Sequence, residues 1–238
     1  MINEIVRFYG IKNEDLVTEL LKRYMQLVLE KNKEINLTSI TDENEFIIKH
    51  FADSLSLLKY IELELEGKEK VKAIDIGTGA GFPGVAIKIA EPRISLTLVD
   101  SIRKKCDFLS DAIYRIGLSS IEVICSRAED LSKKENYREK YDIAFARAVA
   151  RLNELVEYTI PFVNIGGIFL AQKGSQADEE IEEAKNAIEI LGAKIEKVEK
   201  LTLPNSNEQR SIIVIRKFRQ TPTKYPRKTN QIVKNPIK

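Results

Sequence analysis

The feature that most constrains this chain is a regular alternation of short apolar runs and helical segments that begins at Val71. The runs of strand length cover 71–77, 95–101, 121–126, 141–149 and 166–174, and most precede a segment of helical periodicity. Such alternation predicts a mostly parallel sheet with helices on both faces. Two further β-prone runs, 193–204 and 209–217, are separated only by "NSNE". Because parallel neighbours need a long crossover, we expect this last pair to form an antiparallel hairpin.

Helical segments precede the alternating region. A first amphipathic helix is expected over about 13–34. Its apolar face would carry Leu16, Leu20, Tyr24 and Val28 at helical spacing. A second helix is expected over 42–61, because Asp42 and Glu45 form a capping pair. These patterns divide the chain into an N-terminal helical extension (1–68), an α/β domain (69–217) and a C-terminal tail (218–238).

The tail carries most of the positive charge. The chain has a formal net charge of +2, but eight Lys and Arg residues and no acid lie from Arg216 onward, which leaves −6 for the preceding residues. Prolines and a scarcity of apolar residues argue against a packed element, so we expect a flexible tail. Such an arm can contact phosphates with salt-dependent affinity, or can be a solvated end with no partner.

Composition excludes several classes of protein. The chain of 238 residues can hold one sizeable core and a small accessory element. No apolar run approaches the roughly twenty residues that span a bilayer, and the N-terminus lacks the apolar core of a signal peptide. Two cysteines, Cys106 and Cys125, are too few for a disulfide framework or a metal cluster. We expect a cytoplasmic monomer without a metal.

The stretch "AIDIGTGAGFPG" (73–84) allows two interpretations. The pattern D-x-G-x-G-x-G, formed by Asp75, Gly77, Gly79 and Gly81, suggests S-adenosylmethionine. The pattern G-x-G-x-x-G, which uses Gly84 as its last glycine, suggests a dinucleotide. In either case, glycines permit close backbone approach and the ligand would lie at the carboxyl ends of the strands.

Other strand ends supply further candidates. Asp100 and Ser101 end the second strand, where an acid can bind a ribose. Ala128 and Glu129 follow the third strand and are candidates for contact with adenine, although Ser126 with Glu129 also fits a helix cap. Arg147 ends the fourth strand and needs a partner if it is buried.

The motifs together resemble one family, the bacterial 16S rRNA guanine-N7 methyltransferases, also called glucose-inhibited division protein B. The matching stretches are "NLTSI", "HFADSLSLL", "DIGTGAGFPGVAIKI", "LVDSIRKKCDFL", "SRAED", "ARAVARL", "FLAQKG" and, in the tail, "KYPRK". The resemblance covers the chain and implies a Rossmann-like class I S-adenosylmethionine-dependent fold. It also implies methylation of one guanine, number 527 in conventional rRNA numbering. It places Gly77, Phe82, Ala128, Glu129 and Arg147 at the cofactor.

The residues that are missing fit methylation at N7. The end of the fourth strand reads "ARAVA" instead of the N/D-P-P-Y/F element of many exocyclic-amine methyltransferases. Neither cysteine falls in a loop where a nucleophile is needed. Guanine N7 carries a lone pair and no hydrogen, so in-line transfer needs orientation and no general base. No residue is therefore assigned as catalytic, and Arg147 and Lys173 are positioning candidates.

The expected partner is 16S rRNA in the small ribosomal subunit, with its target base in a loop or flipped out. The RNA-binding candidates are Asn36, His50, Arg103, Lys104, Lys105, Arg151, Lys224, Arg227 and Lys228. His50 can equally be a packing or capping residue, and the cluster 103–105 can be a solvated first helical turn.

Two other functions stay open at this point. One is a nicotinamide-dependent oxidoreductase, although little chain follows Arg147 to build a substrate domain. The other is a protein that binds S-adenosylmethionine or RNA without transferring a methyl group, since positioning chemistry leaves no nucleophile to look for.

Overall fold

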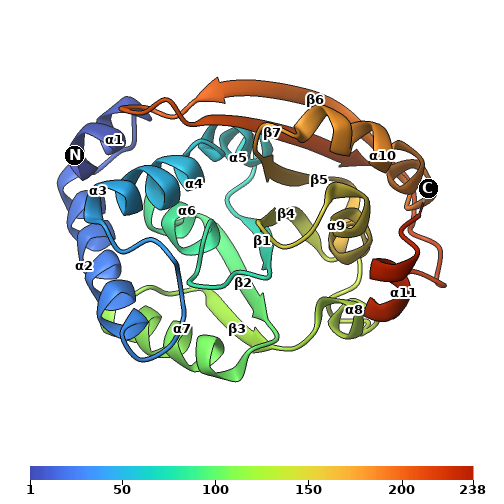
Figure 1. Cartoon of the computed structure of the whole chain (residues 1–238), viewed down its shortest axis with the longest axis horizontal. Helices are drawn as coiled ribbons and strands as arrows, with labels where there is room; N and C mark the ends of the chain where they lie inside the picture. The colour runs from blue at the N-terminus through green and yellow to red at the C-terminus, as the bar shows by residue number, and fades with distance from the viewer. Residues whose placement is uncertain (238) are drawn as a thin grey trace.

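A computed structural model describes residues 1–237 and contains one seven-stranded sheet flanked by helices on both faces (Figure 1). The strand order is β3-β2-β1-β4-β5-β7-β6. The strands are β1 (Val71–Ile76), β2 (Ile94–Asp100), β3 (Ile121–Cys125), β4 (Tyr141–Arg147), β5 (Val163–Lys173), β6 (Ala193–Thr202) and β7 (Gln209–Lys217). The first five pair in parallel, and β7 is antiparallel to both β5 and β6. The predicted sheet and its terminal hairpin are confirmed.

The helices fall into two groups. The extension contains α1 (Ile2–Phe8), α2 (Glu14–Asn32), α3 (Glu43–Phe46), the π-helical turn η1 (Ile47–Ala52), α4 (Asp53–Leu55) and α5 (Leu58–Leu65). The rest are α6 (Gly84–Ala90), α7 (Arg103–Ile116), α8 (Ala128–Leu131), α9 (Leu152–Thr159), the 3₁₀ turn η2 (Ile160–Phe162), α10 (Ala177–Ile190) and α11 (Thr229–Lys234). As predicted, Asp42 caps the second helical segment by accepting from the Glu45 amide at 2.9 Å.

Each face of the sheet has its own core. One core joins the N-terminal helices to α6 and α7, and the other joins α8 to α11. Figure 1 shows the helices of the first core, α1 to α7, in blue to green and those of the second core, α8 to α11, in yellow to red. Because β1 pairs with β2 on one side and β4 on the other, the strand order reverses beside β1. Ligands of doubly wound sheets bind at this switch point, outside the carboxyl ends of the strands.

The apolar face of α2 differs from the predicted one. Leu16 is 56% exposed, whereas Val17 and Leu21 are buried together with Tyr24 and Val28. The prediction was therefore wrong for Leu16, whereas Leu20 is partly buried and packs against the core. Tyr24 is fully buried and donates from Oη to the Ala80 carbonyl at 2.6 Å. The extension thus packs directly on the glycine loop.

The tail contains packed residues, so the expectation of a flexible tail without a packed element was wrong. Beyond Lys217, the described chain folds back on the α8–α9 face, where Tyr225, Ile232 and Ile237 are buried. Arg227 pairs with the fully buried Glu157 at 2.7 Å. Three of its five apolar residues are buried, whereas Phe218 and Val233 are 47% and 54% exposed, so a low overall hydropathy concealed a packed segment. Lys238, the last residue of the predicted tail, lies outside the described residues.

None of the helices in residues 1–237 is long and apolar enough to cross a membrane.

Candidate active site

The loop between β1 and α6 is built from glycines for steric reasons. Gly77, Gly79 and Gly81 have φ values of 68°, 59° and 87°, in the left-handed region that favours glycine. A Cβ on Gly77 would lie 2.7 Å from Cγ2 of Val149. The Gly77 amide donates to the Val99 carbonyl at 2.9 Å, which ties the loop to the end of β2.

Asp75 braces this loop from below. Its fully buried Oδ2 accepts from Thr78 Oγ1 at 2.7 Å and from the Gly84 amide at 2.9 Å. Burial raises the pKa of Asp75 to about 6, although these two hydrogen bonds act in the opposite direction. Oδ1 has no hydrogen-bond partner within the described chain. A water molecule or a ligand cation can satisfy such an acceptor.

Asp100 connects the loop to a cavity. Its Oδ2 accepts from the Gly79 amide at 3.0 Å, and its Oδ1 accepts from the Ile102 amide at 2.9 Å. The side chain also lines a cavity of about 300 Å³ at the carboxyl ends of β1, β2 and β3. Carboxylate oxygens can accept more than one hydrogen bond, so Asp100 has capacity left for a ligand.

The cavity brings together part of the predicted cofactor site. Its wall consists of Ile76, Gly77, Val99, Asp100, Ser101, Ser126, Arg127, Ala128, Glu129, Val149, Ala150, Glu154, Tyr158, Thr229 and Val233. Five of the predicted cofactor residues are in this wall: Gly77, Asp100, Ser101, Ala128 and Glu129. The other five, Asp75, Gly79, Gly81, Phe82 and Arg147, are not. The wall therefore gathers residues from the ends of several strands, as a nucleotide site requires.

The predicted helix cap at Ser126 and Glu129 does not form. Arg127 is the N-cap residue of α8, and it makes no side-chain capping bond. Ser126 instead donates from Oγ to the Arg127 carbonyl at 3.1 Å. Glu129 is buried and accepts a hydrogen bond from Oγ1 of Thr229 in the tail. Glu129 is thus held at the cavity by a partner 100 residues away.

Arg147 points toward the N-terminal extension. Its Nη1 donates to Asp53 Oδ2 at 3.0 Å and to the Lys49 carbonyl at 2.8 Å. Its Nη2 lies 2.8 Å from His50 Nδ1, and the guanidinium is 5.6 Å from the centre of the Phe82 ring. The partner that burial demands is therefore supplied by the protein itself.

His50 is locked in one tautomer by its neighbours. Burial, reinforced by the charge of Arg147, lowers the pKa of His50 to about 3, so the ring is neutral. Because Arg147 can only donate, Nδ1 accepts, and Nε2–H donates to Thr38 Oγ1 at 2.9 Å. The ring stacks on Phe82 with centroids 4.5 Å apart. These contacts support the packing alternative for His50.

Sequence reasoning missed the centre of this cluster, Asp53. The carboxylate is 4% exposed, pairs with Arg147, and lies 3.4 Å from Nε of Arg210. Nε2 of Gln172 donates to its Oδ1 at 3.0 Å. The stretch "HFADSLSLL" contained the signal, because Asp53 follows His50 by three residues and shares its helical face.

Two other predicted cations are engaged by acids of α10. Lys173 is 9% exposed, and its Nζ lies 2.7 Å from Glu180 Oε2 and 2.6 Å from the Ala150 carbonyl. Arg151 pairs with Glu179 and Glu183 at 3.1 and 3.0 Å. Both side chains lie near the end of β4 and hold the β4–α9 segment against α10.

The remaining RNA-binding candidates are mostly exposed. Asn36, Arg103, Lys104, Lys224 and Lys228 are exposed, and Lys105 is half-buried. Arg103 to Lys105 occupy the first turn of α7, as predicted. Arg227 is different, since its guanidinium pairs with Glu157.

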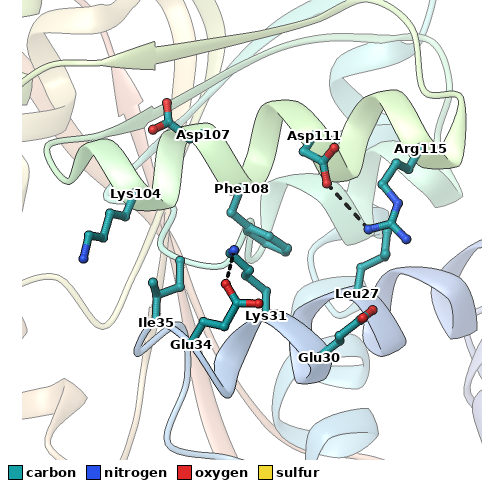
Figure 2. Close-up of a pocket in the computed structure, with 10 residues that line it drawn as sticks. All are labelled: Leu27, Glu30, Lys31, Glu34, Ile35, Lys104, Asp107, Phe108, Asp111 and Arg115. Atoms are coloured by element: carbon teal, nitrogen blue, oxygen red, sulfur yellow. Dashed lines mark hydrogen bonds and ion pairs between the residues drawn. The ribbon is translucent and has the colours of Figure 1, made fainter.

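A larger hollow of about 590 Å³ lies between α2 and α7. Figure 2 shows its lining, in which Lys31 pairs with Glu34 and Arg115 with Asp111. None of the glycine-loop residues lines this hollow. It is therefore separate from the candidate cofactor site.

The sheet topology and the glycine loop at the switch point define the class: a class I S-adenosylmethionine-dependent methyltransferase fold. Solved structures agree on the fold. The precorrin-6y C5,15-methyltransferase of Geobacter metallireducens has a TM-score of 0.51 at 14% identity and covers 68% of this chain and 88% of its own. M. jannaschii TYW2 in complex with AdoMet has a TM-score of 0.50 at 14% identity, and the match covers 69% of this chain and 75% of TYW2.

Sequence comparisons identify the family within this class. The model of the GidB family, rRNA small subunit methyltransferase G, matches residues 17–214. Ribosomal RNA small subunit methyltransferase G of Caldicellulosiruptor bescii is 54% identical over 237 residues, which cover 100% of this chain and 99% of the relative. The same protein of Alkaliphilus metalliredigens is 46% identical, and the match covers 96% of this chain and 94% of the relative. The chain belongs to the rRNA small subunit methyltransferase G family and is an S-adenosylmethionine-dependent rRNA methyltransferase. The predicted resemblance to this family and the predicted cofactor, S-adenosylmethionine, are confirmed. The alternative of a nicotinamide-dependent oxidoreductase is therefore excluded.

Proposed function

We propose that this chain transfers a methyl group to N7 of one guanine of 16S rRNA, guanine 527 in conventional numbering. The observation that carries the proposal is the convergence of Gly77, Asp100, Ala128 and Glu129 on one cavity at the sheet's switch point. In the proposed arrangement, that cavity holds the nucleoside end of S-adenosylmethionine.

The residues of the cavity fit this cofactor. Asp100 keeps acceptor capacity for a ribose diol, although two backbone amides already use its oxygens. At Gly77 a ligand can come close to the backbone, because the residue has no side chain and a Cβ there would collide with Val149. Ala128 and Glu129 line the same cavity, and we assign them to the adenine end of the cofactor. Asp75, by contrast, supports the loop from behind the wall.

Methyl transfer to N7 requires the protein to hold the guanine in line with the methyl group and does not require it to remove a proton. When bound, S-adenosylmethionine supplies an electrophilic methyl group, which N7 attacks with its lone pair as the carbon–sulfur bond breaks and its electrons stay on sulfur. No proton leaves N7, so no base is required. At the end of β4, Arg147 is held in a fixed position by its contacts with His50, Asp53 and Phe82. Arg147 and Lys173 remain our positioning candidates.

We place the substrate on the exposed cations. Arg103 and Lys104 lie at the start of α7, and only Ile102 separates them from Asp100 and Ser101. Lys224 and Lys228 are exposed and lie on either side of Arg227, which pairs with Glu157 of α9. We propose that the enzyme acts as a cytoplasmic monomer on the small ribosomal subunit or its RNA, and that residues 1–68, 69–217 and 218–238 are its three segments.

The test is methyl transfer from labelled S-adenosylmethionine to 16S rRNA and to small subunits that lack the modification. We expect label at N7 of a single guanine, located by chain cleavage at 7-methylguanosine, and loss of transfer in Asp100→Ala. Cofactor binding without transfer to either substrate would favour the alternative of a non-catalytic binding protein. Label at another base or another guanine would contradict the proposed site specificity.

A further inference from the structure

The C-terminal segment reaches the cofactor cavity. Thr229 and Val233 of α11 line it together with Asp100 and Glu129. These two residues lie well over 100 positions beyond the glycine loop, and no strand-end argument points to them. Figure 1 shows α11 beside α8 and α9.

The segment is anchored before it reaches the cavity. Arg138 donates to the carbonyls of Thr221 and Tyr225 at 2.9 and 3.0 Å. The fully buried Glu157 accepts from the Arg227 amide at 2.7 Å and from its guanidinium at 2.7 Å. A buried carboxylate that loses its only cation is strongly destabilising, so these contacts hold the chain firmly just before α11.

Within α11, two side chains differ in what they offer. Thr229 donates from Oγ1 to the buried carboxylate of Glu129, the residue proposed for the adenine end. Ile232 is fully buried and fixes the helix, whereas Val233 is 54% exposed and lines the cavity. A half-exposed apolar side chain at the mouth of a cavity gains burial when a ligand fills it.

We infer that residues 221–237 form the outer wall of the cofactor pocket, with Thr229 orienting Glu129 and Val233 covering the bound nucleoside. This inference rests on the proposed placement of S-adenosylmethionine in the cavity. It makes the basic tail a part of cofactor binding, in addition to any contact with RNA.

The test measures binding of two probes, S-adenosylmethionine and 5′-methylthioadenosine, by titration calorimetry. Val233→Asn should weaken both about tenfold, because an apolar cover over the ligand is lost. Thr229→Val should weaken both by roughly three- to tenfold, because Glu129 loses its donor. The matched control is Leu63→Asn, which changes a 60% exposed apolar residue of α5 remote from the cavity and should leave both affinities unchanged.

Wild-type affinity in both Val233→Asn and Thr229→Val, or tighter binding, would overturn the inference. A loss confined to S-adenosylmethionine would also overturn it, since the contact would then lie at the methionine end. Failure of the proposed site is distinguishable. In that case Asp100→Ala would bind both probes as well as the wild type, whatever the tail variants do.

Discussion

At the scale of single residues, Asp75 is the most informative group. Burial raises its pKa to about 6, so the folded chain holds its proton more tightly than the unfolded chain does. The contribution to stability is therefore fully present below about pH 4 and is lost as the pH rises through 6. Asp75→Asn, which stays neutral, should become more stable relative to the wild type by up to about 3 kcal/mol over that range. Chemical unfolding of both proteins from pH 4 to 7 measures this difference.

Asp111→Asn, at an exposed site on α7, is the control and should give a difference that does not change with pH in this way. A flat curve for Asp75→Asn would mean that the buried carboxylate is not the titrating group. The sequence placed Asp75 and Asp100 at the ends of their strands, where the structure has them within one residue, because strand ends can be read from apolar runs. It did not predict that Arg147 would find Asp53, since a pair 94 residues apart depends on how the extension packs.

At the scale of elements, the contact of α2 with the glycine loop can be tested. Tyr24 is fully buried, and its hydroxyl donates to the Ala80 carbonyl at 2.6 Å. Tyr24→Phe should lower the free energy of unfolding by about 1–3 kcal/mol, because that buried carbonyl loses its partner. It should also weaken cofactor binding, since Gly79 and Gly81 flank Ala80 in the loop. Thermal unfolding and titration with S-adenosylmethionine measure the two effects.

Tyr114→Phe removes the same hydroxyl from an 85% exposed residue of α7 and should change neither quantity. An equally small effect of Tyr24→Phe would show that the extension does not support the loop through this bond.

Periodicity predicted the extent of α2 well but misplaced its face near Leu16. The reason is that apolar residues occur on two sides of its first turns, and only the packed structure decides which side is buried.

At the scale of the whole molecule, the alternation of strands and helices was enough to predict the sheet and its final hairpin. The tail was not predictable in the same way. Its Tyr225, Ile232 and Ile237 are buried in the core on the α8–α9 face, and its Arg227 pairs with Glu157, whose need for a cation cannot be read from the local sequence. Composition describes a segment on its own, whereas burial depends on the surface that receives it.

The distribution of charge over the molecule gives the last prediction. The formal net charge is only +2, so RNA must be held by local cations. If phosphates meet Arg103 and Lys104, the double variant Arg103→Gln with Lys104→Gln should bind 16S rRNA more weakly. The slope of log affinity against log salt should then fall by about 0.7–0.9 for each contact removed. The control removes the same charge from α10 and β6, as Lys185→Gln with Lys194→Gln, and should keep the wild-type slope. β6 is the edge strand at the opposite end of the sheet from β3. Equal slopes for the two double variants would therefore mean that RNA binding depends on the total charge and not on Arg103 and Lys104 at the start of α7.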